Sequence, residues 1–161
     1  MIPFDVLFKE YNQKIFNLIY RLTGNYDDAK DLTQDVFLLA YKSYSRFRQE
    51  ANVYSWLYKI ALNHCSNNFK KKRKIVSLDE YMTNNNPGAD EELEKKEEEI
   101  KVRWAINTLP NKYKEVIILR EIENLSYNDI SKILSLSKEV VAIRLFRARI
   151  KLKKKLEKFR Q

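Results

Sequence analysis

Hydrophobic residues recur at spacings of three and four over most of the chain, which is the pattern of amphipathic helices. In the first segment this pattern covers residues 4–22 and stops at Thr23-Gly24, where a glycine is suited to end a helix. Asn25 can cap the next helix. Further helices are predicted over 25–44, 53–74, 91–108, 111–123, 126–134 and 138–157. No period-two alternation typical of strands persists, so the sequence predicts an all-α fold.

On the second predicted helix, the apolar side consists of Ala29, Leu32, Val36, Leu39 and Ala40. Asp31, Gln34 and Asp35 follow the i, i+3, i+4 spacing that places side chains together on one helical face. This polar patch is displaced from the apolar side, with Phe37 and Leu38 nearby. It can meet basic side chains of a partner, or it is an ordinary solvated face.

The segment SYNDISKILSLSKEVVAIRLFRAR, residues 126–149, contains a short helix, a break at Ser135-Leu136 and a second helix. Ser126 and Ser137 are suited to cap the two helices. The buried side of the second helix is predicted to consist of Val141, Leu145, Ala148, Leu152 and Leu156. Its opposite side carries Glu139, Ala142, Ile143, Phe146 and Arg147. This arrangement predicts a helix-turn-helix, whose second helix fits the DNA major groove, rather than a hairpin with a solvated basic face.

Charge divides the 161-residue chain into three parts. Lys and Arg outnumber Asp and Glu by 13 to 7 over residues 1–74 and by 16 to 6 over 101–161. Over 75–100 the balance reverses to 2 against 9, which gives a net charge of +9 for the whole chain. We therefore expect two small helical domains, 1–74 and 96–161, joined by an acidic linker over 75–95. The acidic run is interpreted as the solvated start of a helix rather than as a mimic of nucleic acid. The two basic blocks suit binding to a polyanion.

Composition excludes several classes of function. One cysteine and one histidine exclude an internal disulfide and a four-cysteine zinc site, and adjacent His64 and Cys65 point in different directions on a helix. We expect a packed thiol and an exposed imidazole. No nucleophile–base pair, metal cluster or phosphate-binding glycine loop is recognisable, which predicts a non-enzyme without a cofactor or small-molecule substrate. The N-terminal segment has no secretory pattern, so we expect a cytoplasmic protein.

Residues 46–74 mix basic side chains with aromatic ones, a combination that holds single-stranded nucleic acid by stacking on bases and following the backbone. Trp56 is the exception. It shares the apolar side of its helix with Leu57 and Ile60, so it is interpreted as a core residue.

The chain resembles the extracytoplasmic-function (ECF) sigma factors of the sigma-70 superfamily. The stretch RWAINTLPNKYKEVIILREIENLSYNDISKILSLSKEVVAIRLFRARIKLKKKL is similar to their promoter-reading C-terminal domain. DDAKDLTQDVFLLAYK is similar to the helix that grips the polymerase clamp, and FRQEANVYSWLYKIALNHCSNNFKKKRK to the segment that melts and reads the minus-ten element. The matches occur in the order typical of the family.

This resemblance implies an alternative sigma factor that binds core RNA polymerase, at its clamp and flap, and directs promoter-specific transcription initiation. Its expected DNA partners are duplex promoter and the melted non-template strand, and its expected regulator is a membrane-anchored anti-sigma factor. Polymerase-binding residues would be Asp31, Gln34, Asp35, Phe37 and Leu38. Minus-ten residues would be Arg48, Gln49, Glu50, Asn52, Lys59, Asn63, Lys70, Lys71 and Arg73. Major-groove residues would be Ser137, Lys138, Glu139, Ala142, Ile143, Arg144, Arg147 and Arg149.

The second helix of the helix-turn-helix departs from the family. SKEVVAIR replaces the frequent Ser-x-Gly-Thr-Val-Lys-Ser-Arg. A glutamate can accept from cytosine N4, and alanine or isoleucine can contact a thymine methyl, so the minus-thirty-five sequence of the family does not carry over. Ile143 and Phe146 could instead contact a protein. Leu62 and Asn67 also stand where the family often has Arg and Asp.

Two other functions remain open from the residues alone. A helix-turn-helix repressor or activator would bind duplex DNA without polymerase, usually as a dimer on a palindrome. A basic helical adaptor would bind RNA or an anionic membrane with a steep salt dependence and no sequence preference. The separate resemblance of the first block favours a sigma factor over both.

Overall fold

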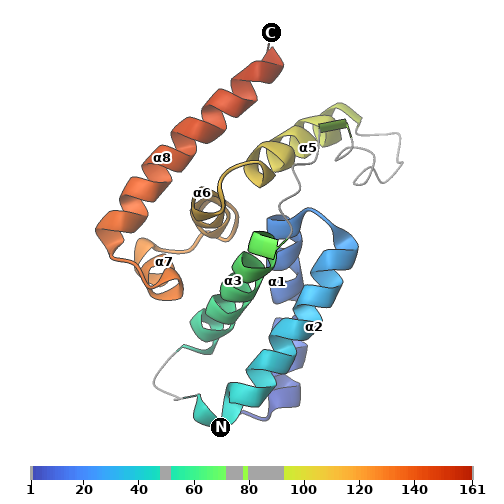
Figure 1. Ribbon diagram of the computed structural model, residues 1–161, viewed down its shortest axis with the longest axis vertical. Helices are drawn as coiled ribbons and strands as arrows, with labels where there is room; N and C mark the ends of the chain where they lie inside the picture. Colours follow the sequence, from blue (N-terminus) through green and yellow to red (C-terminus); the bar gives the residue numbers. More distant parts are fainter. Residues whose placement is uncertain (1, 48–51, 72–77, 80–92, 161) are drawn as a thin grey trace.

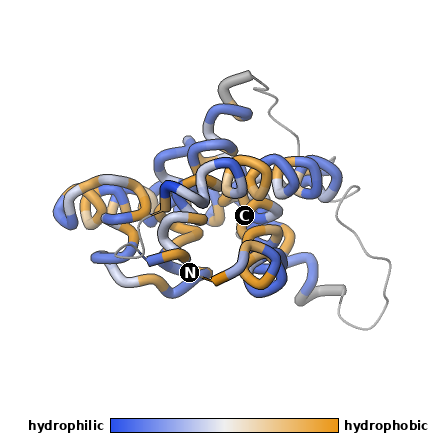
Figure 2. Tube along the Cα trace, turned by 90° about the horizontal axis from the view of Figure 1, so that it is seen from below, coloured by the Kyte–Doolittle hydropathy of each residue, from blue (hydrophilic) through white to orange (hydrophobic). Residues whose placement is uncertain are grey.

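The structure of the protein is a computed structural model that describes residues 2–47, 52–71, 78–79 and 93–160 (Figure 1). Within these ranges the regular secondary structure is entirely helical, which confirms the predicted all-α fold. Hydrophobic and hydrophilic stretches alternate along the helices, as amphipathic packing requires (Figure 2). None of the described helices is long and apolar enough to cross a membrane.

The helices begin and end close to the predicted positions. In chain order they are α1 (Phe4–Thr23), α2 (Tyr26–Ser43), the 3-10 turn η1 (Tyr44–Arg46), α3 (Val53–Lys71), α5 (Leu93–Asn107), α6 (Asn111–Ile117), the π-helical turn η3 (Ile118–Ile122), α7 (Tyr127–Leu134), α8 (Lys138–Glu157) and the 3-10 turn η4 (Lys158–Arg160). The segment predicted as one helix over 111–123 is thus α6 followed by a π-helical turn. Most of the predicted linker, 75–95, lies outside the described residues.

The predicted helix caps are confirmed. Gly24 ends α1 with a positive φ of 68°, a conformation that glycine adopts without steric cost. The side chain of Asn25 accepts a hydrogen bond from the Asp28 amide at 2.9 Å. Ser126 accepts from the Asp129 amide at 3.0 Å, and Ser137 from the Val140 amide at 3.2 Å. These side chains satisfy amide groups that have no partner within the helix.

Helices α1, α2 and α3 lie side by side and form the N-terminal half, residues 2–71 (Figure 1). Leu39 is exposed, so its predicted place on the apolar side is wrong. Phe37 instead points inward, is only 5% exposed, and packs edge-to-face against Phe4 and Phe8 of α1. Trp56 is half-buried against Phe47 and Tyr44, which agrees with its interpretation as a core residue.

Helices α5 to α8 form the C-terminal half, residues 93–160, in which α8 runs along one side (Figure 1). The buried side of α8 is as predicted at Val141, Leu145 and Ala148, which are fully buried. Leu152 and Leu156 continue this side and are half-buried. The side of α8 opposite this core faces away from the rest of its half.

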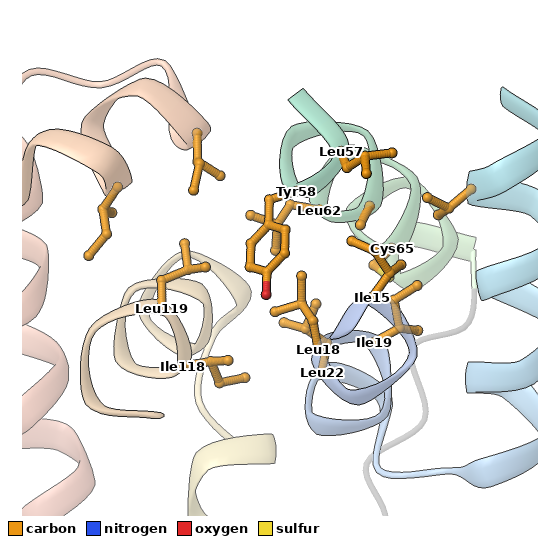
Figure 3. Close-up of a cluster of buried hydrophobic side chains, with 14 of the residues drawn as sticks. Ile15, Leu18, Ile19, Leu22, Leu57, Tyr58, Leu62, Cys65, Ile118 and Leu119 are labelled. Atoms are coloured by element: carbon orange, nitrogen blue, oxygen red, sulfur yellow. The ribbon is translucent and has the colours of Figure 1, made fainter. Parts of the chain in front are cut away.

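The two halves contact each other through what we call the seam, formed by Leu22 and Tyr58 on one side and Lys114, Leu119 and Glu123 on the other. Figure 3 shows Tyr58 between the leucines and isoleucines of α1 and those of η3. Most of the buried hydrophobic residues of both halves belong to one continuous cluster. The two predicted domains therefore share buried surface across the seam.

Candidate nucleic-acid interfaces

The outward side of α8 is exposed to solvent over the first turns of the helix. Ser137 caps the helix, so its first turns project from the turn that follows α7. Lys138, Glu139 and Arg147 are exposed, and Ala142 is half-buried. Ile143 is 49% exposed and Phe146 65% exposed. This side is therefore exposed to solvent, as a groove-reading helix requires.

Two of the predicted major-groove arginines face elsewhere. The Nε and Nη2 atoms of Arg149 lie 2.8 and 2.7 Å from a carboxylate oxygen of Glu121 in η3, and this hydrogen bond raises the pKa of the guanidinium. Arg144 is half-buried, and its charge lowers the pKa of Glu115, although burial raises that pKa more. Arg149 therefore lies on the flank of α8 that faces η3, because an acidic partner 28 residues earlier in the chain holds it there.

Helix α3 carries those predicted minus-ten residues that the structure describes. The Asn52 side chain accepts a hydrogen bond from the Tyr54 amide at 3.0 Å, so it caps the start of α3. Lys59 donates to the Ser135 hydroxyl at 2.8 Å, which ties this cation to the turn of the helix-turn-helix. Arg48, Gln49, Glu50 and Arg73 lie outside the described residues, as do the side chains of Lys70 and Lys71.

A hollow of about 410 Å³ lies between the end of α2 and the middle of α3. It is lined by Leu39, Lys42, Ser43, Arg46, Ile60, Asn63, His64 and Asn67. Of these, the sequence assigned only Asn63 to the minus-ten site. Lys42 and Arg46 add positive charge beside it, which suits a phosphate of a bound strand. Arg46 already belonged to the basic and aromatic segment 46–74, whereas Lys42 lies at the end of α2, outside that segment.

The outward side of α2 carries the predicted polar patch. Asp31, Gln34 and Asp35 are all exposed, and Leu38 is 59% exposed beside them. Phe37 was expected to supply apolar contact here, but it is buried in the core and the expectation is wrong for this side chain. Tyr41 extends the same face and was missed, although it lies ten residues, nearly three helical turns, after Asp31.

Among the described residues, His64 and Cys65 are not part of any group of three or more His, Cys, Asp and Glu side chains that could hold a metal ion. Cys65 is buried, as expected, and burial raises its pKa to about 12. His64 is half-buried rather than exposed. Its Nε2 lies 3.1 Å from a carboxylate oxygen of Asp35, so it ties α3 to the polar patch of α2.

Comparison with known proteins gives consistent matches over both halves. Residues 7–75 match the family model of sigma-70 region 2, and residues 100–152 match that of sigma-70, region 4. The RNA polymerase sigma factor YlaC of Bacillus subtilis is 33% identical over 160 residues, which cover 96% of this chain and 92% of that protein. The ECF RNA polymerase sigma-E factor of Escherichia coli is 32% identical and covers 91% and 82%. The chain belongs to the ECF sigma factors.

Solved structures agree on the fold of this sigma factor. The sigma factor RpoE in complex with the anti-sigma factor NepR from Bartonella quintana has a TM-score of 0.72 and 21% identity, and covers 96% of both chains. CnrH in complex with the cytosolic domain of CnrY has a TM-score of 0.69 and 22% identity, and covers 96% of this chain and 87% of that one. As an ECF sigma factor, the chain directs promoter-specific transcription initiation by RNA polymerase.

Within this sigma factor, the seam joins region 2 to region 4 through buried polar groups. Lys114 is 7% exposed, and its Nζ donates to the Leu22 carbonyl at 3.0 Å. Its Nζ also lies 4.3 Å from the centre of the Phe69 ring. Burial lowers the pKa of Lys114 to about 8, because a charged ammonium loses hydration there.

Glu123 is the second polar centre of the seam. One of its carboxylate oxygens accepts from Arg21 at 2.8 Å, and the other accepts from the Tyr58 hydroxyl at 3.1 Å. Burial and the neighbouring Tyr54 raise the pKa of Tyr58 well above its usual value, so Tyr58 stays protonated and can donate. Lys59 and Ser135 add a further contact at the edge of the seam. Region 4 thus rests against the helix that carries the predicted minus-ten residues.

Proposed function

We propose that this sigma factor binds core RNA polymerase through the outward side of α2, captures the melted promoter strand with α3 and the hollow beside it, and reads the upstream duplex with α8. The observation that carries the proposal is the exposed patch of Asp31, Gln34, Asp35 and Leu38. It combines acids with one prominent apolar side chain, on a helix whose opposite side is buried. Such a patch fits a basic, partly apolar partner surface.

The minus-ten function is proposed for residues on two sides of the hollow. Asn63 and Asn67 of α3 offer amide groups that can pair with base edges. Lys42 and Arg46, from the end of α2 and from η1, supply cations for the backbone of the strand. Lys59 joins them once its hydrogen bond with Ser135 is released. The roles of Arg48, Gln49, Glu50 and Arg73, which lie outside the described residues, remain predictions from the family resemblance, as do those of Lys70 and Lys71.

A second polymerase contact is proposed on region 4. A groove of about 430 Å³ lies between η3 and the end of α8, with Ile117, Leu152 and Leu156 on its apolar floor. Glu121, Arg149, Lys153 and Glu157 form its polar rim. This mixture suits an amphipathic helix laid into the groove. The flap of core polymerase is the proposed occupant.

We infer that the two halves separate when DNA is bound, because region 4 covers part of α3, where Tyr58 and Lys59 are hydrogen-bonded to Glu123 and Ser135. An anti-sigma factor that favours the closed arrangement would then hold the protein inactive. One protein of the same fold, which covers nearly the whole chain, has been solved with an anti-sigma factor. This supports an anti-sigma partner here, and anchoring of that partner in the membrane remains a prediction. The function is proposed to be non-enzymatic and cytoplasmic, since the chemistry of initiation belongs to the polymerase.

The test is run-off transcription with the purified chain, sigma-free core polymerase and fragmented genomic DNA, followed by sequencing of RNA 5′ ends. We expect starts that cluster below a shared two-part motif. Leu38→Arg is expected to abolish these starts without unfolding the chain, because the side chain is exposed. Val6→Arg on α1 is the matched control, since Val6 is also an exposed apolar residue but lies outside the patch. If the chain alone bound palindromic duplex sites tightly and core polymerase gave only background starts, the proposal would be wrong.

A further inference from the structure

The start of α8 exposes apolar side chains where a groove-reading helix needs groups that recognise bases. Successive residues turn by about 100° around a helix. Since Val141, Leu145 and Ala148 face the core, Ile143 and Phe146 lie on the opposite side. These two side chains are among the most exposed large apolar residues of the described chain. Exposure of these apolar side chains to water is unfavourable, so their burial against a partner would contribute favourable free energy to binding.

Two of the three arginines that could read guanine from this helix are held elsewhere, while Lys138 at its start is exposed. Arginine recognises guanine through O6 and N7. Arg149 is paired with Glu121, and Arg144 is half-buried within reach of the Glu115 charge. Arg147 is the exposed arginine that remains close to Ile143 and Phe146 in the sequence. The outward side of α8 is therefore poor in guanine-reading groups and rich in apolar surface.

We propose that Ile143, supported by Phe146, reads thymine methyl groups in the major groove of the upstream promoter element, and that Glu139 selects a cytosine beside them. The thymine C5-methyl is the apolar group that the major groove displays, and a glutamate can accept from the N4 amino group of cytosine. This inference rests on the proposed function, because it specifies what α8 reads. It predicts an upstream element with thymines at the positions facing Ile143.

The surroundings of the two side chains favour DNA over a protein partner. Lys138 and Arg147 are exposed near the start of the row, and Lys151 and Lys154 are exposed farther along the helix. The C-terminal block carries 16 Lys and Arg against 6 Asp and Glu. Cations around an apolar row can contact phosphates while the row contacts base edges. An apolar partner helix would have to neutralise the same cations.

The experiment begins with the holoenzyme assembled from the full chain and core polymerase. Promoters are selected from templates whose upstream duplex is randomised, and thymine enrichment is scored in that element. Each selected thymine is then replaced by uracil, which keeps the base pair and removes only the methyl group. We expect initiation to fall roughly fourfold for each methyl that contacts Ile143 or Phe146.

The variant Ile143→Ala assigns the effect to this side chain. It should initiate roughly fourfold less from the thymine template and equally from the thymine and uracil templates at the contacted position. Ile150→Ala is the matched control, because Ile150 is 42% exposed on the same side of α8 but lies two turns farther from its start. Its discrimination between thymine and uracil should match that of the unaltered chain.

Three results would overturn the inference. The first is a holoenzyme that starts at a defined site but does not distinguish uracil from thymine, which leaves the proposed function intact. The second is a loss of core binding or of anti-sigma binding in Ile143→Ala with discrimination unchanged, which would assign the row to a protein partner. The third is an absence of any defined start, which would overturn the proposed function as well.

Discussion

Helices α3 and α8, the two helices proposed to read DNA, differ in what covers them. α3 packs against α1 and α2, and α7 lies against a further part of it. Its Tyr58 and Lys59 are hydrogen-bonded to Glu123 and Ser135 of region 4. α8 is covered by its own half on one side only, and Ile143 and Phe146 stand free on the other.

If α3 and α8 read DNA as proposed, this difference predicts that the two reading functions are not available at the same time. In the closed arrangement α8 can approach a duplex, whereas α3 has part of its reading surface engaged by region 4. The binding free energy that polymerase and promoter supply must therefore exceed the free energy of the seam. On this proposal, the free energy of the seam must be overcome before α3 can capture the melted strand. The following experiments either alter the seam or leave it unaltered.

The largest effect is expected from locking the seam. Lys59→Cys and Ser135→Cys, joined by a cleavable thiol crosslinker, should abolish promoter-specific transcripts, because region 4 can then not leave α3. Cleavage of the crosslinker should restore them. Cys65 should not react, since it is buried and its pKa is about 12.

The control for this lock is the same crosslink between Gln13→Cys and Asn17→Cys, which joins two successive turns of α1 and does not cross the seam. Run-off transcription measures both proteins. Normal initiation by the chain locked at the seam would show that the halves need not separate.

A smaller effect is expected from weakening the seam at Glu123. Glu123→Ala removes the acceptor of both Arg21 and Tyr58, and leaves a buried hydroxyl without this partner. A loss of about 1.5 kcal/mol, or roughly a tenfold rise in the open population, follows from a charged hydrogen bond of this kind. Energy transfer between dyes at Lys30→Cys and Lys154→Cys should report the opening.

Glu121→Ala is the matched control, because Glu121 lies in the π-helical turn that ends directly before Glu123 but pairs within its own half. Its energy transfer should stay at the value of the unaltered chain. Equal opening in both variants would mean that the turn, rather than the contact across the seam, determines closure.

The free energy of unfolding should depend on pH because the amine of Lys114 is buried in the seam. The pKa of Lys114 is about 8 in the folded chain against an ordinary value of 10.5, so between these values the unfolded chain binds more protons. The free energy of unfolding should then rise from pH 8 to pH 9, by at most about 1.4 kcal/mol per pH unit. Above pH 9 the thiol of Cys65, which ionises more easily when unfolded, acts in the opposite direction.

Chemical denaturation at half-unit steps between pH 7.5 and pH 9 measures this slope. Lys114→Met should remove it, whereas Lys112→Met, which changes an exposed lysine of the same helix, should keep it. A slope that persists in Lys114→Met would assign the effect to another group.

The smallest effect is expected from a change at the start of α8, the less covered of the two helices. Ser137→Ala removes the cap of α8 and should lower the free energy of unfolding by about 1 kcal/mol. Energy transfer across the seam should not change, because the cap lies outside it. A change in seam opening would show that the start of α8 and the seam are coupled.

The sequence predicted the local features of this fold and missed those that depend on distant partners. Periodicity placed the helices, and Asn25, Ser126 and Ser137 cap them as expected, because a cap depends on residues two or three positions away. Phe37 and Leu38 are neighbours in the sequence and therefore point about 100° apart on the helix. Phe37 points inward, where it packs against the rings of Phe4 and Phe8 of α1. The spacing on α2 alone could not supply that information.

The same limit applies to the charged residues. Arg149 was assigned to DNA and faces Glu121, and Lys59 was assigned to a melted strand and donates to Ser135. Both partners lie far away in the sequence, and no local pattern identifies them. Nor does a local pattern identify the π-helical turn at Ile118–Ile122, which places Glu121 and Glu123 toward different halves.

Cys65 has a consequence for how this regulator can receive signals. It is the chain's single cysteine, and burial leaves very little of it as thiolate at neutral pH, although the thiolate is the form that peroxides oxidise. The chain is therefore not built as a thiol-based sensor of oxidants. An oxidative stimulus that altered its transcriptional output would have to be detected by another molecule and relayed to it through binding.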